Sequence, residues 1–542
     1  MGDPTARRSI LVASNRGPVS FTRGDDGRLS ARRGGGGVVS GLSSVASHGQ
    51  MLWVCAALSD ADRVAARQAP GGMLDMDGNA GGSAIQMLSI PPAIFNRAYN
   101  TVANSVLWFV HHMLYDTPNR PQFGISFRRD WQAYREYNAT FARALAAAPG
   151  AEPASAEAAS AEPASAEATS TEAASTEAEP ASAEAEPASA EGAHTEAFST
   201  GAAEPVRAIV QDYHLTLVPR MLAELRPGVR IAHFSHTPWA PVDYFRLLPD
   251  AIAWEVLDGI LGADHAGFLS QRWADAFLDC CEHVLGAEVD RDRQRITHRG
   301  HVTGVGVHPL GVDAPELIRR AAEPDVEVRM AALAEVIGDR KLIVRVDRTE
   351  LSKNIVRGLA AYRELLLTRP EWRGQVIMLA LAYPSRHDLP EYREYAASVQ
   401  RIAREIEDEF GTPDWTPIVL HANDDYPRSL AGYRLADVLL VNPIRDGMNL
   451  VAKEGPILAD RGCTLVLSRE AGAAAELGSD ALMVNPFDVS ATAAALHEAL
   501  GMSQEERTRR CRSLAAAAGA ITPSVWFADQ LAALDQDVTR DG

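Results

Sequence analysis

The sequence predicts an α/β protein made of two Rossmann-like, doubly wound domains that face each other across a cleft. Short, continuously apolar segments recur between longer segments with helical spacing, a pattern typical of parallel sheets covered by helices on both faces. The pattern occurs on both sides of a boundary near Gly311. A chain of 542 residues also has the length for two domains of ordinary size.

Each predicted strand leads directly into polar residues. The strands predicted before Gly311 span 10–13, 208–210 and 231–234, and those after it span 342–346, 376–382, 438–441 and 465–467. The loops that follow begin with pairs such as Gln211-Asp212 and Ser235-His236. Since ligands of doubly wound sheets bind beyond the carboxyl ends of the strands, the sequence predicts a binding site among these loops.

The chain is expected to divide into three parts. Residues 1–311 form the first Rossmann-like domain, residues 312–500 form the second, and residues 501–542 form C-terminal helices and a tail. Within the first part, residues 148–205 repeat a motif of Ala, Glu, Ser, Thr and Pro. Such a composition cannot bury enough apolar surface to offset chain entropy, so we expect a disordered insertion there.

Composition excludes several classes of protein. The net charge is −19, but residues 151–204 hold twelve Glu and no Lys, Arg or Asp, so the rest carries −19 + 12 = −7. This charge does not favour a nucleic-acid partner. The five cysteines form no CxxC pair, which favours a reducing compartment without disulfides or zinc. With no long apolar run or signal peptide, we expect a cytoplasmic enzyme with small-molecule substrates and no membrane partner, and a homo-oligomer is left open.

One string, DGMNLVAKE at 446–454, combines groups suited to a phosphorylated sugar. Free backbone N–H groups at a helix start near Asn449 would bind phosphate. Asp446 would accept hydrogen bonds from sugar hydroxyls, and Glu454 would accept them from a ribose diol. An acidic residue before a glycine, taken alone, fits a turn with a helix cap equally well.

A second string, DRTELSK at 347–353, carries two cations on one strand-end loop. Arg348 and Lys353 would clamp a diphosphate and stabilise the charge on a leaving group. Taken alone, they also fit a solvated basic pair beside Glu350.

Glycines and histidines add further candidates. Four glycines at 34–37 lead into a predicted helix and would let the backbone approach a ligand, or would form a flexible turn. They match neither GxGxxG nor a Walker motif. Asp212 and His214 follow one strand, and His236 follows the next. A lone histidine is more often structural, but two at equivalent strand ends favour a role at the site.

Together these strings resemble the trehalose-6-phosphate synthase family of retaining glycosyltransferases. The matching strings are SNRGPV at 14–19, VQDYHLTLVP at 210–219, HFSHTPWAP at 233–241, ILGADHAGF at 260–268, VDRTELSK at 346–353, RDGMNLVAKE at 445–454 and LSREAGAAAEL at 467–477. The resemblance implies the glycosyltransferase-B fold, no metal or other cofactor, and transfer of glucose to the anomeric hydroxyl of glucose 6-phosphate with retention.

The resemblance also implies roles for individual residues. The residues implied in catalysis are His236, Asp446, Arg348 and Lys353. The residues implied in donor binding are Gly36, Gly37, Arg348, Lys353, Met448, Asn449, Leu450 and Glu454. The residues implied in acceptor binding are Arg16, Tyr99, Trp108, Asp212 and Arg386.

The chain departs from the family pattern where the family contacts the base of the donor. Residues 423–425 read Asn-Asp-Asp in place of an apolar residue. Asp424 could accept hydrogen bonds from both N1–H and the 2-amino group of guanine, and uracil has no such donor pair. The sequence therefore predicts GDP-glucose as donor over UDP-glucose.

Three alternatives stay open. The chain could be a pseudo-glycosyltransferase that couples cyclitols, a glucosylglycerol-phosphate synthase, or a non-catalytic sugar-phosphate sensor. Retention of Arg348, Lys353, Asp446 and Glu454 argues against the sensor. The acceptor set favours glucose 6-phosphate over other acceptors, although specificity is a small energy difference.

Overall fold

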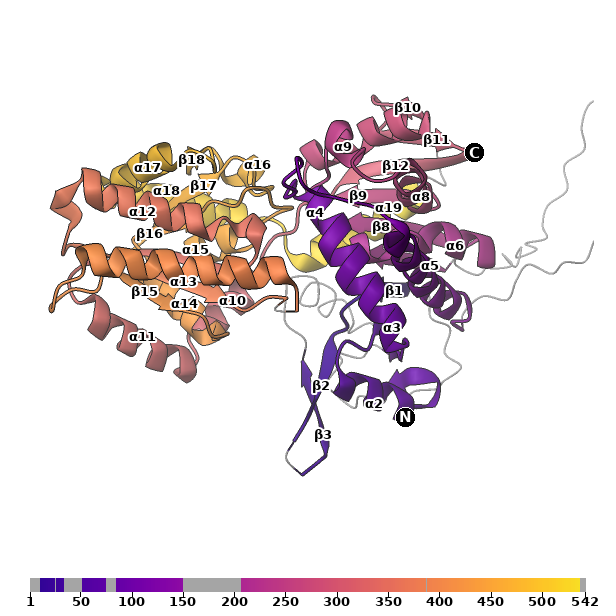
Figure 1. The fold of residues 1–542 in the computed structure, drawn as a ribbon, viewed down its shortest axis with the longest axis horizontal. Helices are drawn as coiled ribbons and strands as arrows, with labels where there is room; N and C mark the ends of the chain where they lie inside the picture. Colours follow the sequence, from indigo (N-terminus) through magenta and orange to yellow (C-terminus); the bar gives the residue numbers. More distant parts are fainter. Residues whose placement is uncertain are drawn as a thin grey trace, which may run out of the picture.

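The computed structural model describes residues 10–24, 26–33, 51–74, 84–149, 206–386 and 388–536. It has two lobes, each built around one large sheet (Figure 1). Nearly all of the insertion predicted at 148–205 lies outside the described residues, as do Gly36 and Gly37.

The sheet of the first lobe has ten strands among the described residues, in the order β10-β11-β12-β9-β8-β7-β1-β4-β6-β5. The run from β12 to β6 is parallel, and antiparallel strands lie at both edges. The strands are β1 Ile10–Ser14, β4 Met51–Ala56, β5 Met73–Leu74, β6 Ala84–Leu88, β7 Arg207–Gln211, β8 Arg230–Ser235, β9 His265–Phe268, β10 Glu288–Asp290, β11 Arg295–His298 and β12 His301–Val307. The three strands predicted for this half are confirmed as β1, β7 and β8.

Helices cover this sheet, and the hairpin of β2 Val19–Arg23 and β3 Leu29–Arg33 projects from the lobe (Figure 1). The helices are α2 Asp60–Gln68, η2 Pro70–Gly72, α3 Pro92–Phe95, η3 Asn96–Leu107, α4 Trp108–His111, α5 Ile125–Ala146, η4 Tyr213–Leu215, α6 Val218–Leu225, α7 Val242–Phe245, α8 Asp250–Ile260, α9 Gln271–Cys280 and η5 Cys281–Leu285.

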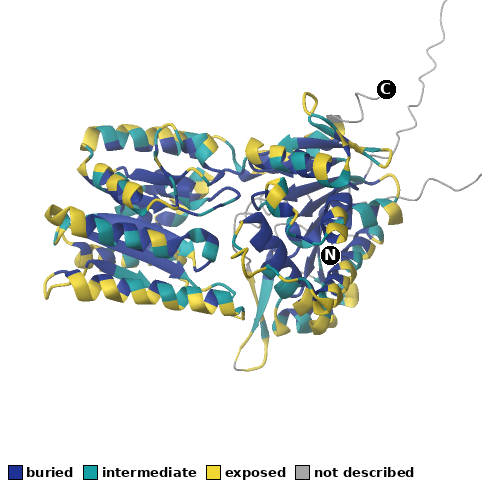
Figure 2. Ribbon diagram, turned by 45° about the horizontal axis from the view of Figure 1, so that its top comes forward, coloured by how far each residue is buried: buried dark blue, intermediate teal, exposed yellow. Residues whose placement is uncertain are grey.

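The sheet of the second lobe is parallel throughout its described strands, in the order β15-β14-β13-β16-β17-β18. Its strands are β13 Lys341–Arg348, β14 Val376–Tyr383, β15 Ile418–His421, β16 Val438–Val441, β17 Thr464–Ser468 and β18 Leu482–Val484. Its helices are α10 Ala314–Ala321, α11 Pro324–Ile337, η6 Leu351–Lys353, α12 Ile355–Thr368, η7 Pro370–Trp372, α13 Pro390–Phe410, α14 Tyr426–Leu435, α15 Val451–Leu458, α16 Ala474–Leu477 and α17 Val489–Gly501. The four strands predicted here are confirmed as β13, β14, β16 and β17. Both sheets are buried between helices whose outer faces are exposed (Figure 2).

The last two helices divide between the lobes. Helix α18 (Gln504–Ala518) packs on α15 of the second lobe, whereas α19 (Pro523–Gln536) packs on β8 and β9 of the first lobe. The side chain of Trp526 is fully buried, and its ring lies edge-on to Phe234 at a centroid distance of 5.0 Å.

The predicted domain boundary at 311 stays a prediction, and it falls where the chain crosses between the lobes. The crossing at Gly311 lies against the return crossing before α19, because a Cβ at Gly311 would lie 1.7 Å from the carbonyl oxygen of Ile521. Among the helices of the described part of the chain, none is long and apolar enough to cross a membrane.

Candidate active site

Residues at the carboxyl ends of strands from both lobes meet between the lobes. Arg386, which follows β14 of the second lobe, donates to the hydroxyl of Tyr213 in the first lobe at 3.2 Å. Its guanidinium also lies 4.7 Å from the ring centroid of Trp108. The predicted residues Arg386 and Trp108 therefore come together from the two lobes.

Lys353 and Asp446 form the central ion pair of the second lobe. Lys353 Nζ donates to Asp446 Oδ2 at 2.6 Å, and Asn449 Nδ2 donates to the same oxygen at 3.0 Å. Burial would raise the pKa of Asp446, but the Lys353 ammonium outweighs it and lowers this pKa. Asp446 is therefore ionised at neutral pH, and Lys353 has further N–H groups to offer an anion.

The loop around this pair leads into helix α15, and Asn449 bonds the first turn of that helix. Asn449 has a positive φ of 82°, and its Oδ1 accepts from the backbone N–H of Ala452 at 3.2 Å. Helix α15 begins at Val451, so the helix start predicted near Asn449 is confirmed to within two residues. Met448 is buried, and Leu450 directly precedes the helix. The side chain of Asn449 thus bonds both the first turn of the helix and Asp446.

Glu454 is a carboxyl group in an apolar setting. Burial raises its pKa to about 7, although the hydroxyl of Tyr433 opposes this rise. The Glu454 carboxyl therefore binds a proton more readily near neutral pH than an exposed glutamate does. Because the carboxyl is buried, its oxygens can accept a hydrogen bond from a ligand hydroxyl, and cations from the solvent have little access to them.

Arg348 and Arg386 share the carboxylate of Glu350. Glu350 Oε1 lies 3.2 Å from Arg348 Nη1 and 4.0 Å from Arg386 Nη1, and it accepts from Ser385 Oγ at 2.9 Å. The Glu350 side chain is 2% exposed, whereas the Arg348 side chain is 60% exposed. Arg348 is thus held at its inner side and presents its remaining N–H groups outward. The interpretation of Arg348 and Lys353 as a solvated pair does not hold for Lys353, whose side chain is only 16% exposed and is paired with Asp446.

Aromatic residues surround the Arg386 guanidinium. It donates to the hydroxyls of Tyr392 and Tyr213, and it lies over the Trp108 ring. Tyr213 in turn donates to Asn104 Oδ1 at 2.8 Å. A guanidinium fixed over an aromatic face in this way is a rigid donor for an anionic group.

Tyr99 and Arg16 lie near this cluster on the first lobe. The Tyr99 ring stacks on His214 with centroids 5.4 Å apart. Burial lowers the pKa of His214 to about 3, and the charges of Arg386 and Arg16 lower it further. Arg16 is exposed and lines a hollow of about 240 Å³ that also contacts Asp62.

Asp212 and His236 follow neighbouring strands and fix each other. The backbone N–H of His236 donates to Asp212 Oδ1 at 3.2 Å, and His236 Nε2 donates to Gln211 Oε1 at 2.6 Å. Burial raises the pKa of Asp212 to about 6, against the opposing hydrogen bonds from the backbone of Tyr213 and His236. Burial also lowers the pKa of His236 to about 3, so its imidazole is neutral at physiological pH.

His236 also marks the contact between the lobes. A Cβ added at Gly447 would lie 1.9 Å from the carbonyl oxygen of His236. Only glycine fits there, and Gly447 directly follows Asp446. The two predicted catalytic groups His236 and Asp446 are therefore brought together by a backbone contact without a side chain between them.

Sequence reasoning missed three residues of this site: Gln211, Glu350 and His112. His112 Nδ1 donates to the carbonyl oxygen of Trp108 at 2.8 Å. Burial lowers the pKa of His112 to about 4, against the opposing charge of Asp446, so its neutral ring keeps Nε2 as an acceptor. Gln211 and Glu350 stand inside the motifs quoted above, and a polar side chain at a strand end was the available signal for both.

Two sets of predicted residues are not joined to the cluster by a described contact. Asp424 is exposed in the loop before α14, while its neighbour Asp425 caps that helix and pairs with Arg329 at 2.9 Å. Gly36 and Gly37 lie outside the described residues.

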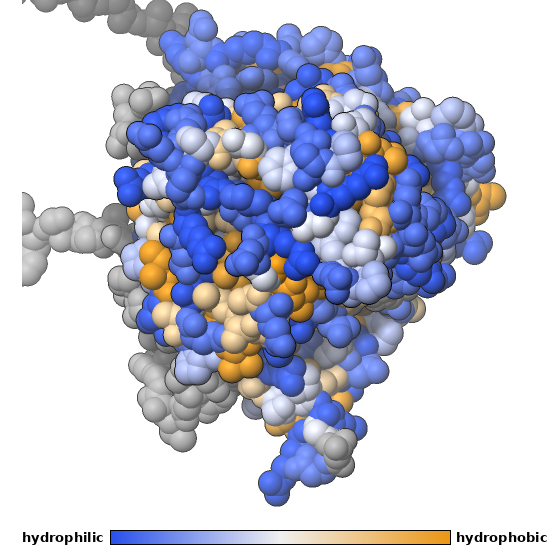
Figure 3. Space-filling view, turned by 90° about the vertical axis from the view of Figure 1, so that its left-hand side faces the viewer, coloured by the Kyte–Doolittle hydropathy of each residue, from blue (hydrophilic) through white to orange (hydrophobic). Residues whose placement is uncertain are grey.

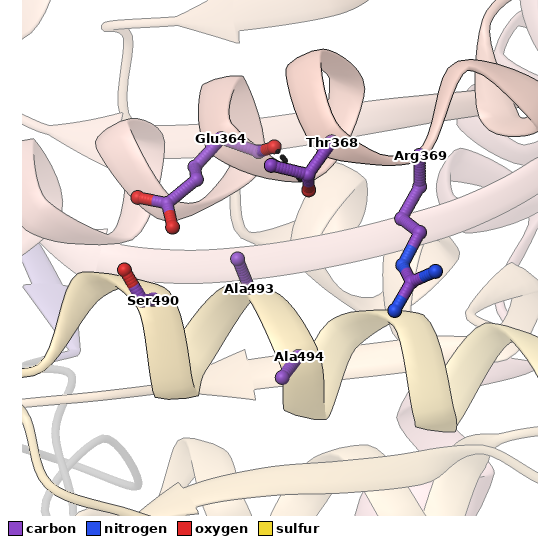
Figure 4. A pocket seen from close by; sticks show the side chains of 6 residues that line it. All are labelled: Glu364, Thr368, Arg369, Ser490, Ala493 and Ala494. Atoms are coloured by element: carbon purple, nitrogen blue, oxygen red, sulfur yellow. Dashed lines mark hydrogen bonds between the residues drawn. The ribbon is translucent and has the colours of Figure 1, made fainter.

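The outer side of the second lobe differs in character from this cluster. Its surface is mostly hydrophilic with small groups of apolar residues (Figure 3). A hollow of about 320 Å³ between α12 and α17 is lined by Glu364, Thr368, Arg369, Ser490, Ala493 and Ala494 (Figure 4). None of these is a residue predicted for the substrate site.

Two Rossmann-like lobes that meet at anion-binding groups beyond the strand ends are the architecture expected of a glycosyltransferase of the GT-B fold. Residues 198–536 match the family model described as Glycosyltransferase family 20. The chain therefore belongs to glycosyltransferase family 20.

Individual relatives agree with this assignment. The chain is 38% identical over 308 residues to a bifunctional trehalose-6-phosphate synthase/phosphatase of Thermoproteus tenax, which covers 56% of this chain and 42% of that protein. It is 30% identical over 515 residues to a probable alpha,alpha-trehalose-phosphate synthase (UDP-forming) 2 of Arabidopsis thaliana. That match covers 94% of this chain and 54% of that protein. The chain thus spans about half the length of these two relatives.

A solved structure shares the fold over nearly the whole chain. The crystal structure of an alpha,alpha-trehalose-phosphate synthase (UDP-forming) from Burkholderia vietnamiensis has a TM-score of 0.75 and 26% identity. The match covers 98% of this chain and 100% of that one. The predicted GT-B fold is confirmed.

Proposed function

We propose that this protein transfers glucose from a nucleoside-diphosphate glucose to glucose 6-phosphate with retention, forming α,α-trehalose 6-phosphate. The observation that carries the proposal is the presence of two anion-binding groups whose arginines lie against the same carboxylate, that of Glu350. One is Arg348 with Lys353, and the other is Arg386 over Trp108. A donor diphosphate and an acceptor phosphate need such a pair. The names of the relatives support the same reaction.

On the donor side, Arg348 and Lys353 would hold the diphosphate, with Gly36 and Gly37 as further contacts. Asp446 would accept from the hydroxyls of the transferred glucose, since it is ionised and buried. The backbone of Met448, Asn449 and Leu450 at the start of α15 would complete the donor site. Glu454 would accept from the ribose diol.

On the acceptor side, Arg386 and Arg16 would hold the phosphate of glucose 6-phosphate, and Tyr99 and Trp108 would pack against the sugar. Asp212 would accept from acceptor hydroxyls. The aromatic surroundings of Arg386 support this assignment, because they fix the guanidinium before the ligand arrives.

The chemistry needs position and charge more than acid–base groups. The bond between the anomeric carbon and the diphosphate breaks, and the acceptor's anomeric oxygen bonds to that carbon on the same face. The acceptor's proton passes to the departing diphosphate. Arg348 and Lys353 would stabilise the charge on the leaving group, and the neutral His236 would contact the glucose. These two side-chain cations would supply the charge that a metal ion supplies in other transferases.

The donor base is a separate question. The preference for GDP-glucose predicted from Asp424 is not supported by the comparisons. The Arabidopsis thaliana relative and the Burkholderia vietnamiensis structure are both named as UDP-forming synthases. The exposure of Asp424 supports only a weak influence on the base. We therefore propose UDP-glucose as the donor and keep GDP-glucose as the competitor in the test.

The test is product analysis by NMR. Purified protein is incubated with glucose 6-phosphate and, separately, with UDP-, GDP- or ADP-glucose in the presence of EDTA. An α,α-1,1-linked disaccharide phosphate is the expected product. Folded protein that transfers glucose from none of these donors would overturn the proposal. That result would favour a cyclitol-coupling enzyme, a glucosylglycerol-phosphate synthase or a non-catalytic sensor. A faster rate with GDP-glucose would restore the guanine argument.

A further inference from the structure

Trp273 of the first lobe lies at the contact between the two lobes. It stands in α9, and its side chain is 1% exposed. Two guanidinium groups lie over its ring, that of Arg272 at 5.0 Å and that of Arg445 at 4.5 Å. Arg272 is its neighbour in the first lobe, whereas Arg445 belongs to the second lobe and directly precedes Asp446.

The indole N–H of Trp273 reaches the donor-binding loop itself. Trp273 Nε1 donates to the carbonyl oxygen of Gly447 at 3.0 Å. On its other side, the same loop is held by its own lobe. The backbone N–H of Asp446 donates to the carbonyl oxygen of Glu470 at 3.2 Å, and the Asp446 carbonyl oxygen accepts from the backbone N–H of Gly472 at 3.1 Å. The peptide between Asp446 and Met448 is thus fixed from both lobes at once.

Arg445 anchors the beginning of the loop in the first lobe. Its Nη2 donates to the carbonyl oxygen of Trp239 at 3.0 Å, and only 7% of the residue is exposed. A buried cation is costly unless it is paired. The Trp273 ring and the Trp239 carbonyl supply this compensation only while the lobes are in contact. A second link crosses the same contact, the ion pair of Arg272 with Glu470 at 2.7 Å.

We infer that Trp273 is a positioning residue that holds the donor-binding loop, residues 445–449, from the opposite lobe. The inference rests on the proposed function, because it assigns Asp446 and its neighbours to the donor. Trp273 touches no substrate in this scheme. It sets the place of the Gly447 peptide, and through it the places of the Asp446 carboxylate and the Met448 backbone. Donor binding should then favour contact between the lobes, and contact between the lobes should favour donor binding.

The effect should be specific to the donor. Described contacts connect Trp273 with the loop 445–449, whereas the acceptor cluster is built on Arg386, Trp108 and Tyr213. A general loss of packing would weaken both substrates, and loss of a positioning contact would weaken one. This difference separates a positioning role from a merely structural one.

The test compares Trp273→Phe with Trp254→Phe in the full chain. Trp254 lies on α8 of the same lobe, 39% exposed and outside the site, so it controls for the loss of an indole group elsewhere in this lobe. Calorimetry measures the binding of UDP and, separately, of glucose 6-phosphate. We expect Trp273→Phe to weaken UDP binding about fivefold, the usual worth of one neutral hydrogen bond. Its binding of glucose 6-phosphate and both affinities of Trp254→Phe should stay within twofold of wild type.

Steady-state kinetics and a milder variant complete the test. Trp273→Phe should raise the KM for the donor and lower kcat, with the KM for the acceptor unchanged. Arg272→Gln, at a half-exposed position, should fold normally and weaken UDP binding in the same direction by about twofold. Unchanged UDP binding in both variants would overturn the inference, as would equal weakening of both ligands. If wild-type protein binds UDP but transfers no glucose, the proposed function fails while the binding comparison still decides the role of Trp273.

Discussion

Replacing Glu350 by Gln removes one buried negative charge and preserves the volume of the side chain. The carboxylate lies between the guanidinium groups of Arg348 and Arg386 and accepts from Ser385 Oγ at 2.9 Å. A glutamine amide can still accept that hydrogen bond. The two arginines, however, lose the anion they share, so the variant isolates the effect of the charge.

The magnitude follows from the pKa of Glu350. Burial would raise it, but Arg348, Arg386 and Lys353 outweigh burial and lower it from the ordinary 4.5 to about 2. At about 1.4 kcal/mol per pKa unit, the folded protein favours the ionised form by about 3 kcal/mol. Because the folded pKa is depressed, this stability is present above about pH 4.5 and is lost as the pH falls toward 2. We therefore expect Glu350→Gln to lower the free energy of unfolding by about 3 kcal/mol at pH 7 and by about half of that at pH 3.

Urea denaturation followed by tryptophan fluorescence measures this difference at several pH values. The matched control is Glu409→Gln, which removes the exposed ion pair with Arg363 and should cost at most about 1 kcal/mol. If Glu350→Gln is as stable as wild type at pH 7, the desolvation penalty of the buried carboxylate equals its favourable interaction with the two arginines. That result would refute the account of Glu350 as the shared anchor of the two arginines.

Three further substitutions test other parts of the site. Gly447→Ala would place a Cβ 1.9 Å from the His236 carbonyl oxygen, so we expect transfer to fall by about a hundredfold in a rate assay, and near-normal activity would contradict the close contact. Since burial raises the pKa of Glu454 to about 7, its carboxylate forms as the pH rises through 7. The donor KM should therefore fall between pH 6 and 8 in wild type and stay flat in Glu454→Gln, and parallel profiles would exclude Glu454 as the titrating group. Lys353→Met leaves the buried Asp446 carboxylate unpaired, so we expect the free energy of unfolding to drop by about 3–5 kcal/mol, and an unchanged urea midpoint would argue against the pair.

Several strands could be predicted because they are continuously apolar, although the equally apolar β4 was not predicted. The predicted strands at 376–382 and 438–441 agree with β14 and β16 to within one residue at each end. Strand β9 was missed because His265 and Gly267 interrupt its apolar run, and β18 has only three residues. Such strands are specified by their neighbours in the sheet more than by their own sequence.

The site could be predicted as a set of residues but not as a set of partners. Local sequence placed Arg348 and Lys353 on one loop, and the structure keeps them there. The partner that fixes Arg348 is Glu350, which also pairs with Arg386 from the loop after β14. Similarly, the need for glycine at Gly447 arises from a carbonyl group in the other lobe. Contacts between distant segments carry no local signal in a single sequence.

Helix α19 gives the chain an unusual order of assembly. Its residues Trp526, Phe527 and Leu534 are fully buried, and Arg230 on β8 donates to the Leu534 carbonyl oxygen at 3.1 Å. The sheet of the first lobe is therefore synthesised first, but part of its covering comes from a helix that follows the whole second lobe in the chain. Until that helix is made, the face of β8 around Phe234 lacks its packing partner. The first lobe can reach its native core only after the entire second lobe has been made. The two lobes therefore complete their folding together and not one after the other.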